Sequence, residues 1–399
     1  MAALIILPEF DAAIRASTPE LTALRRDLHQ HPELAFQEHR TAALVADRLE
    51  RAGLAVKRGV GRTGIVAELH GDRPGPLVVW RADMDALPIQ EQVQQAYASR
   101  APGTMHACGH DGHTAIAVML AELLARHRRT LTGTVVLVFQ PAEEVLEGAR
   151  EMLDTGALDG YQPRGVFGLH LSTRFPAGRI EVPEGLAMAA ADLFELIVRG
   201  HGGHGAVLQA GGDPILAATH LVVGLHQLVA SSSTPGEAAL LSIGQFRAGT
   251  TFNVIPDEAV LRGSIRTVTA STRETLLERL RGYAERVAGA HGATAELRLR
   301  SSCPTVVNEA AASAMVCRCA TGVLGPDQVS AGPLVMASDD MSLFLERWPG
   351  CYFRVGAGRS AGESPPHHSP LFDIDERSLA VGLRVACAVI TSALSSPTA

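Results

Sequence analysis

The sequence predicts an α/β protein built from two domains, and three observations support this prediction. The chain has 399 residues, more than a single hydrophobic core usually contains, so two domains are expected. From about residue 20 to 185, short apolar runs typical of strands alternate with helical patterns, which predicts a mostly parallel sheet with helices on both faces. From 187 to 296 the order changes to β-α-β-β-α-β, the pattern of a small ferredoxin-like domain.

The elements of the first domain follow from the hydrophobic period of each segment. We expect helices at 22–31, 40–53 and 113–127, and strands at 63–71, 75–85, 133–144 and 165–171. The runs LVVW and VVLVF are apolar without alternation, as strands covered by helices on both faces require.

The second region has its own set of elements. We expect helices at 213–231 and 271–292, and strands at 192–200, 237–249, 257–267 and 294–301. Beyond residue 305, helical patterns at 308–325 and 378–394 indicate that the chain returns to the first domain. We therefore expect a discontinuous domain of residues 1–186 and 297–399, with residues 187–296 as an insertion.

Composition and charge exclude several classes of protein. Hydrophobic residues at 46% and charged residues at 19% are typical of an ordinary folded chain. The net charge is −7 and no basic run is present, so we expect no nucleic-acid partner. The N-terminal apolar run is too short for a signal core, and later apolar stretches are interrupted before a membrane-spanning length. We therefore expect no membrane partner and a cytoplasmic location.

The stretch MHACGHDGHTA, residues 105–115, concentrates side chains that bind metals, namely His106, Cys108, His110, Asp111 and His113. Of the six cysteines, which form no CxxC pair, only Cys108 lies among such groups. A thiolate, imidazoles and a carboxylate on a glycine-containing loop suit Zn, Co, Ni or Mn. The alternative is a set of histidines hydrogen-bonded around a helix N-terminus, with Asp111 as its cap.

Polar residues follow three of the predicted strands, where a sheet of this class forms its functional crevice. They are Arg81, Asp83 and Asp85 after the first, Gln140, Glu143 and Glu144 after the second, and His170 at the third. If strand geometry persists, Glu143 and Glu144 point to different sides. One could then bind a metal while the other moves protons, as a metal hydrolase requires. The alternative is a pair of surface acids in a loop.

Taken together, these motifs resemble the metal-dependent amidohydrolases that include hippurate hydrolases, N-acyl-amino-acid hydrolases and plant auxin-conjugate hydrolases, within the aminoacylase and carboxypeptidase group. The motifs are, in order, HQHPELAFQEHRT, RADMDALPI, MHACGHDGHTA, FQPAEE, GLHL, GHGGHGA, DPI, FNVIPDEAVLRGSIRT and HHSPLFDIDE. They span residues from about 25 to 380, and CGHDGH with PAEE is the specific pair. The resemblance implies a catalytic domain that binds two metal ions and an inserted ferredoxin-like dimerisation domain.

Carried over position by position, the family's metal ligands fall on Cys108, His110, Glu144, His170 and His368. The family usually has an apolar residue at the position of His367, and His368 keeps the H-x-P-x-F-D spacing. Glu143 takes the general-base position. Asp85 is expected to orient Glu143 or a ligand, and Asp83 to touch the site. His106, Asp111 and His113 are expected to support the ligands.

Three residues of the inserted domain complete the site that the resemblance implies. His204 corresponds to a histidine that enters the partner subunit's site in a homodimer and steadies the developing oxyanion; the alternative is a loop histidine beside glycines. Asn253 is expected to hold the same region. Arg266 is expected to bind a substrate carboxylate through its planar guanidinium, unless it is an ordinary surface residue of a strand.

The resemblance implies hydrolysis of an N-acyl amino acid to a carboxylic acid and a free amino acid. It also implies two divalent ions per subunit, chosen from Zn, Mn, Co or Ni, and a homodimer or a higher homo-oligomer. The same site could instead cleave dipeptides, as a carboxypeptidase-like enzyme does, or N-carbamoyl compounds. More distant alternatives are a hydrolase with Cys108 as nucleophile and a binding protein without catalysis.

Overall fold

The structure is a computed structural model of the chain and describes residues 8–207, 212–232, 237–359 and 364–395. Residues 1–7, which hold most of the N-terminal apolar run considered above, lie outside the described residues. Contacts divide the chain into two compact units. Unit 1 comprises Met1–Ala187, Val307–Pro333 and Asp340–Ala399, and unit 2 comprises Met188–Val306 and Leu334–Asp339.

Unit 1 is built on an eight-stranded sheet with the strand order β1-β2-β4-β3-β5-β16-β6-β15. The strands are β1 (Ala55–Val60), β2 (Gly64–His70), β3 (Arg73–Asp83), β4 (Thr132–Gln140), β5 (Gly165–Pro176), β6 (Ile180–Glu181), β15 (Val329–Ser330) and β16 (Gly350–Gly358). The short strands β7 (Gly185–Met188) and β14 (Val306–Asn308) contain unit boundaries.

The sheet is mixed: its centre is parallel, as expected, and antiparallel pairs flank that centre. The central strands β4, β3, β5 and β16 run parallel to one another, and so do β6 and β15. The pairs β1–β2, β2–β4 and β16–β6 are antiparallel. Only the short turn 61–63 joins β1 to β2, and a parallel pair would need a crossover of a dozen residues or more. The parallel centre nevertheless brings the carboxyl ends of three predicted strands to one edge.

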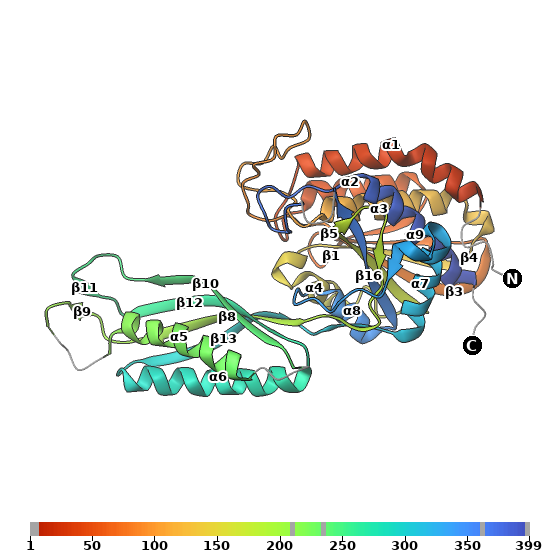
Figure 1. The fold of residues 1–399 in the computed structure, drawn as a ribbon. Helices are drawn as coiled ribbons and strands as arrows, with labels where there is room; N and C mark the ends of the chain where they lie inside the picture. The colour runs from red at the N-terminus through yellow and green to blue at the C-terminus, as the bar shows by residue number, and fades with distance from the viewer. Residues whose placement is uncertain (1–7, 208–211, 233–236, 360–363, 396–399) are drawn as a thin grey trace. The chain divides into compact units, whose positions relative to one another are not determined.

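Helices cover both faces of this sheet. They are α1 (Pro8–Gln30), α2 (His39–Arg51), α3 (His110–Arg126), α4 (Gly148–Asp154), α7 (Ala310–Leu324), α8 (Met341–Arg347) and α9 (Arg377–Ser395), with 3-10 turns η1 (Arg128–Thr130), η2 (Glu143–Val145) and η3 (Pro326–Gln328). Helices α3 and α9 pack against β3, and α1 packs across both of them, while α4 and α8 lie on the other side (Figure 1). Helix α3 is buried from His110 to Leu124, so its first turn lies at the edge where the central strands end.

Unit 2 has the chain order β-α-β-β-α-β that the sequence predicts. Its elements are β8 (Ala190–Arg199), α5 (Pro214–Ser232), β10 (Ala239–Ala248), β12 (Glu258–Thr267), α6 (Ala270–Ala290) and β13 (Thr294–Cys303). The strand order is β10-β12-β8-β13, and every pair is antiparallel. The expected boundary after residue 296 falls inside β13, which pairs with β8 along its whole length, so the unit continues to Val306. The short strands β9 (Gly203–His204) and β11 (Val254–Ile255) pair with each other.

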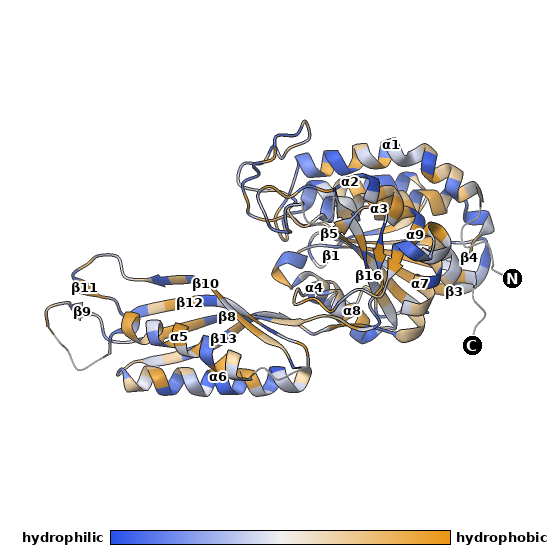
Figure 2. Cartoon of the chain, in the orientation of Figure 1, coloured by the Kyte–Doolittle hydropathy of each residue, from blue (hydrophilic) through white to orange (hydrophobic). Residues whose placement is uncertain are grey.

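Helix α6 buries one apolar stripe, which includes Leu276, Leu277 and Leu280, and Figure 2 shows it alternating between hydrophobic and hydrophilic residues. Two described helices, α5 and α9, are long and apolar enough to cross a bilayer by length and composition alone. This differs from the expectation that no apolar stretch reaches that length. Helix α9 is mostly buried in unit 1, where it contacts α1, α3 and α7, whereas α5 buries one face against α6 and β10 and exposes the other. A membrane span is therefore not indicated by either helix.

Candidate metal and catalytic site

Unit 1 gathers several predicted site residues at the carboxyl ends of its parallel strands. Among the groups of metal-type side chains in the described residues, two share Cys108, and the ligand-type atoms within each of these lie within 4.8 Å of one another. The first group is Cys108, His110 and Glu144, and the second is Cys108, His170 and His367. The Sγ atom of Cys108 lies 3.6 Å from both Nε2 of His170 and Nδ1 of His367. Cys108 is therefore common to two adjoining groups.

The first group contains buried polar atoms that the protein itself leaves unpaired. The Nδ1 atom of His110 donates to the backbone carbonyl of Asp85 at 2.9 Å, which leaves Nε2 as the ring atom that can bind a ligand. Burial lowers the pKa of His110, but Asp83, Asp85 and Cys108 raise it above its usual value, so a metal at Nε2 would displace a proton. Within the described residues, this Nε2 and the Oε1 of Glu144 have no hydrogen-bond partner although both are buried, and they lie 3.9 Å apart. Buried polar atoms are rarely left in that condition. A divalent metal ion between them, with the Cys108 thiolate, fits this donor set.

His170, in β5, presents its ring in the same way. Its Nδ1 donates to the backbone carbonyl of Leu171 at 2.8 Å, so Nε2 directs a lone pair toward Cys108. Burial lowers the pKa of His170 well below its usual value, which keeps the ring neutral. A neutral imidazole with one exposed lone pair is the form that binds metals.

Glu143 and Glu144 lie in the 3-10 turn η2, not in an extended strand, because β4 ends at Gln140. The expected strand alternation therefore does not separate their side chains. The backbone folds sharply here, with Ala142 and Leu146 at φ values of 53° and 57°. Glu143 is only 6% exposed, and its Oε2 lies 3.8 Å from the Nε2 of His110. This burial rules out the alternative of two surface acids in a loop.

Two buried carboxylates hold this turn in place. The Oδ1 of Asp85 accepts the backbone N–H of Glu143, and its Oδ2 accepts that of Glu144, each at 3.0 Å. Glu38 accepts the backbone N–H of Ala142 at 2.9 Å, and burial raises the pKa of Glu38. The expectation that Asp85 orients Glu143 agrees with these contacts. Glu38 was not singled out from the sequence, although it lies inside the FQEHR motif.

His113 and Asp83 are hydrogen-bonded to each other and lie next to His110 of the first group. The Nε2 of His113 accepts the backbone N–H of Leu171 at 2.8 Å, so its Nδ1 carries the proton and donates to Asp83 at 2.7 Å. Arg81 donates to the other oxygen of Asp83 at 2.7 Å. Burial alone would raise the pKa of Asp83, but His110, His113 and Arg81 hold it well below its usual value. Both nitrogens of His113 are occupied by protein groups, which removes it from the set of ligands.

Asp111 and His106 make no hydrogen bond to the proposed ligands within the described residues. Asp111 accepts from Nε of Arg25 at 2.8 Å and from Nδ1 of His29 at 2.7 Å, so it does not orient a ligand imidazole. It is not the cap of α3 either, because the N-cap position is Gly109. Burial lowers the pKa of His106 to about 4, and neither of its ring nitrogens has a partner in the part of the chain described. His106 nevertheless interacts electrostatically with His110 and Asp85.

The adjacent histidines His367 and His368 both approach the ligand groups. The ring of His367 lies beside Cys108, and its Nε2 accepts the backbone N–H of Thr173 at 3.4 Å. His368 has a left-handed backbone, with φ at 64°, and its Nε2 lies 3.3 Å from Oε2 of Glu144. Hydrogen bonding to Cys108 and Glu144 raises the pKa of His368 to about 10. His367 thus approaches Cys108, and His368 approaches both Cys108 and Glu144.

The remaining predicted residues belong to unit 2. His204 lies opposite Val254 in the pairing of β9 with β11, and its Nδ1 accepts the backbone N–H of Ala206 at 3.1 Å. The side chains of His204 and Asn253 are exposed. In β12, Arg266 uses Nη1 to donate to the carbonyl of Met336 at 3.0 Å and to Ser338 at 2.9 Å. Arg266 is thus half-buried and anchored, rather than a loose surface residue.

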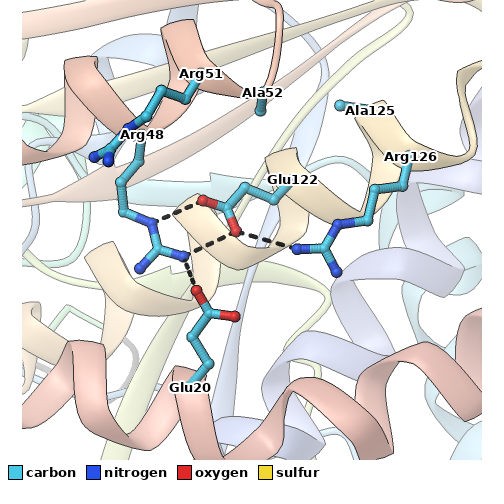
Figure 3. A pocket seen from close by; sticks show the side chains of 7 residues that line it. All are labelled: Glu20, Arg48, Arg51, Ala52, Glu122, Ala125 and Arg126. Atoms are coloured by element: carbon cyan, nitrogen blue, oxygen red, sulfur yellow. Dashed lines mark hydrogen bonds and ion pairs between the residues drawn. The ribbon is translucent and has the colours of Figure 1, made fainter.

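A cavity of about 550 Å³ lies away from these groups, between α1, α2 and α3 (Figure 3). Its charged residues pair with one another, because Arg48 bonds both Glu122 and Glu20 while Arg126 lies 3.8 Å from Glu122. The lining contains no histidine, cysteine or hydroxyl nucleophile. This cavity therefore offers no catalytic group of the kinds that the sequence predicts.

Comparisons with known proteins agree with the metal-binding geometry of this site. Residues 79–392 match Peptidase family M20/M25/M40. The chain is 39% identical to N-acetylcysteine deacetylase of Bacillus subtilis, over 92% of this chain and 95% of that protein. It is 35% identical to thermostable carboxypeptidase 1 of Saccharolobus solfataricus, over 90% and 91%. The crystal structure of the Bacillus subtilis YXEP protein, described as a dinuclear metal-binding peptidase of the M20 family, is 36% identical, with a TM-score of 0.77 and coverage of 95% and 99%.

Proposed function

Because the chain belongs to peptidase family M20/M25/M40, we propose that it hydrolyses the amide bond of N-acyl amino acids, releasing a carboxylic acid and a free amino acid. The relative named N-acetylcysteine deacetylase supports this substrate class. The observation that carries the proposal is the buried ligand set around Cys108, with Glu143 beside it. A metal and an adjacent carboxylate base are what metal-dependent amide hydrolysis requires.

We assign the metal to Cys108, His110, Glu144, His170 and His368. His110 and His170 each present a lone pair, because their other nitrogen donates to a backbone carbonyl. The remaining imidazole ligand is His368, whose ring faces Glu144. The shared Cys108 favours two ions, and this mixed sulfur, nitrogen and oxygen set suits Zn, Mn, Co or Ni.

Different residues of the chain have different roles in the proposed reaction. The metal, when bound, polarises the amide carbonyl and makes a water molecule more acidic. Glu143 accepts the proton from the attacking water and passes it to the leaving amine nitrogen. Asp85 fixes the backbone of Glu143 and Glu144, so that the base and the ligand keep their separation. In this account Cys108 is a ligand and not a nucleophile.

Unit 2 is proposed as a dimerisation domain of a homodimer. Its helix α5 exposes Ile215, Leu216 and Val223, and β10, an edge strand of its sheet, exposes Leu240 and Phe246. Apolar helix and strand surfaces of this kind are typical of subunit interfaces. Through this interface, the exposed His204 would reach the partner's site and stabilise the oxyanion. Asn253 would hold the His204 loop, and Arg266 would bind the substrate carboxylate.

The cytoplasm is the proposed location of the protein.

The test combines metal analysis with a screen for amine release. Purified protein is expected to contain divalent metal and to release amino acid from N-acetyl, N-benzoyl or indole-acyl substrates. Release from dipeptides alone would instead favour the carboxypeptidase-like activity named for the Saccharolobus relative. Ammonia release would indicate an N-carbamoyl substrate. A metal-free protein that retains full amide hydrolysis would contradict the proposal.

A further inference from the structure

His367 and His170 lie at the same distance from Cys108, but one ring turns an N–H toward the sulfur and the other turns an unprotonated nitrogen toward it. Each has a ring nitrogen 3.6 Å from the Sγ atom. The facing nitrogen of His170 is unprotonated, because its other nitrogen donates to the carbonyl of Leu171. A neutral imidazole carries a single N–H, so the partner of the far nitrogen determines what the near nitrogen offers.

For His367 the far nitrogen is an acceptor. The backbone N–H of Thr173 points at its Nε2, at an N to N distance of 3.4 Å. A proton on Nε2 would face that N–H directly, so the proton of the neutral ring must lie on Nδ1. The near atom of His367 is therefore a donor, and 3.6 Å is within the range of an N–H···S hydrogen bond to a thiolate.

The ring of His367 is held in this orientation from several sides. It lies between the ring of Phe372, at a centroid distance of 5.0 Å, and that of His170, at 5.2 Å. The surrounding loop is tied to β5 by Thr173, whose hydroxyl donates to the carbonyl of Pro365 at 3.0 Å. It is also tied to the Cys108 loop, because the N–H of His368 donates to the carbonyl of Ala107 at 2.8 Å.

We propose that His367 is not a metal ligand but a positioning residue, whose Nδ1–H donates to the Cys108 thiolate while that sulfur binds metal. This inference rests on the proposed function, because it assumes the metal site described there. A hydrogen bond to a ligand sulfur withdraws electron density from it and fixes its direction. His367 would thus adjust the strength of the sulfur ligand without occupying a coordination position.

The test compares three variants after loading with Co²⁺. His367→Leu removes the donor, His367→Asn places an amide N–H near the position of Nδ1, and His368→Ala removes the proposed ligand. We expect His367→Leu to bind as many ions at saturation as wild type, with affinity lower by about 10-fold. Its thiolate-to-cobalt charge-transfer band should move to longer wavelength, and His367→Asn should return the band toward the wild-type position. His368→Ala should lose metal.

X-ray absorption gives a direct count of imidazole ligands per metal. That count should be the same in wild type and His367→Asn, a comparison that also decides the question if the leucine variant does not fold. A lower count or a lost ion in either His367 variant would overturn the inference while leaving amide hydrolysis by the wild type unaffected. An unshifted band in His367→Leu would also overturn it. Wild-type protein that binds no metal would contradict the proposed function itself.

Discussion

The Oδ1 atom of Asp85 accepts the backbone N–H of Glu143 at 3.0 Å, and its second oxygen accepts the next N–H along the chain. One buried carboxylate therefore fixes both the proposed base and the ligand Glu144. Asp85→Asn replaces one of these acceptors by an NH₂ group, which would face a backbone N–H. We expect kcat to fall by about 10- to 100-fold, as for other groups that orient metal ligands.

The measurement for Asp85→Asn is kcat at matched metal content. The exposed Asp72, which pairs loosely with Arg128, provides the control, since Asp72→Asn should leave kcat unchanged. Equal kcat values for Asp85→Asn and wild type would remove Asp85 from the catalytic arrangement.

Arg25 is buried and neutralises Asp111. Arg25→Met would leave the buried Asp111 charge without its guanidinium partner and with only His29 beside it, so we expect a loss of about 3–5 kcal/mol in the free energy of unfolding at pH 7. The neighbouring Arg26 is 46% exposed, and Arg26→Met should cost no more than about 1 kcal/mol. Urea unfolding of the two variants measures both values, and similar losses would contradict the assigned role of Arg25.

The effect of Arg25→Met should depend on pH in a defined direction. Burial alone would raise the pKa of Asp111, but Arg25 and His29 hold it well below its usual value. A lowered pKa contributes stability above the unfolded value of about 3.9 and loses it as the pH falls further. In Arg25→Met, burial should raise the pKa of Asp111, so protonation would favour the folded state. The difference from wild type should shrink between pH 7 and pH 4, and a constant difference would contradict this explanation.

Cys108 should behave as a protected ligand. A chelator is expected to abolish activity and added metal to restore it, whereas a thiol-alkylating reagent should leave the metal-loaded enzyme active. The exposed Cys317 serves as the internal control, because its modification shows by mass spectrometry that the reagent was effective. Loss of activity in proportion to alkylation of Cys108 in the metal-loaded protein would instead indicate a cysteine nucleophile.

His204 should act on the site of the partner subunit. His204→Ala is expected to lower kcat by roughly 100-fold or more, by analogy with the loss of one oxyanion donor. A purified mixed dimer of one His204→Ala chain and one Glu143→Gln chain retains one complete site, so it should recover about half of the wild-type rate per dimer. The two variant homodimers are the controls. A mixed dimer as inactive as both homodimers would contradict action across the interface.

The sequence predicted what depends on local pattern and chemical type. Strand ends after LVVW and VVLVF correctly indicated that Asp85, Glu143 and Glu144 would meet, because parallel neighbours end at one edge. It could not predict that Glu143 and Glu144 lie in a 3-10 turn, because strand alternation gives no sign of where the strand stops. The sequence also could not predict the partners of Asp111, because Arg25 is 86 residues away along the chain and charged residues are usually exposed.

The roles of the histidines depend on features that have no sequence signal. His110, His113, His170 and His367 are the same residue type, and only their backbone partners separate those that present a lone pair from those that present a proton. Those partners depend on how distant segments pack against each other, as where the backbone N–H of Leu171 meets Nε2 of His113.

The most direct test of the account is the rate of amide hydrolysis by Glu143→Gln, measured as amine release from an N-acyl amino acid at the same metal content as wild type. The amide side chain keeps the shape of Glu143 but cannot accept the proton of the attacking water. The account predicts unchanged metal stoichiometry and a kcat lower by about 100- to 10,000-fold, with Glu151→Gln, a surface control, at the wild-type rate. Undiminished hydrolysis by Glu143→Gln would contradict it.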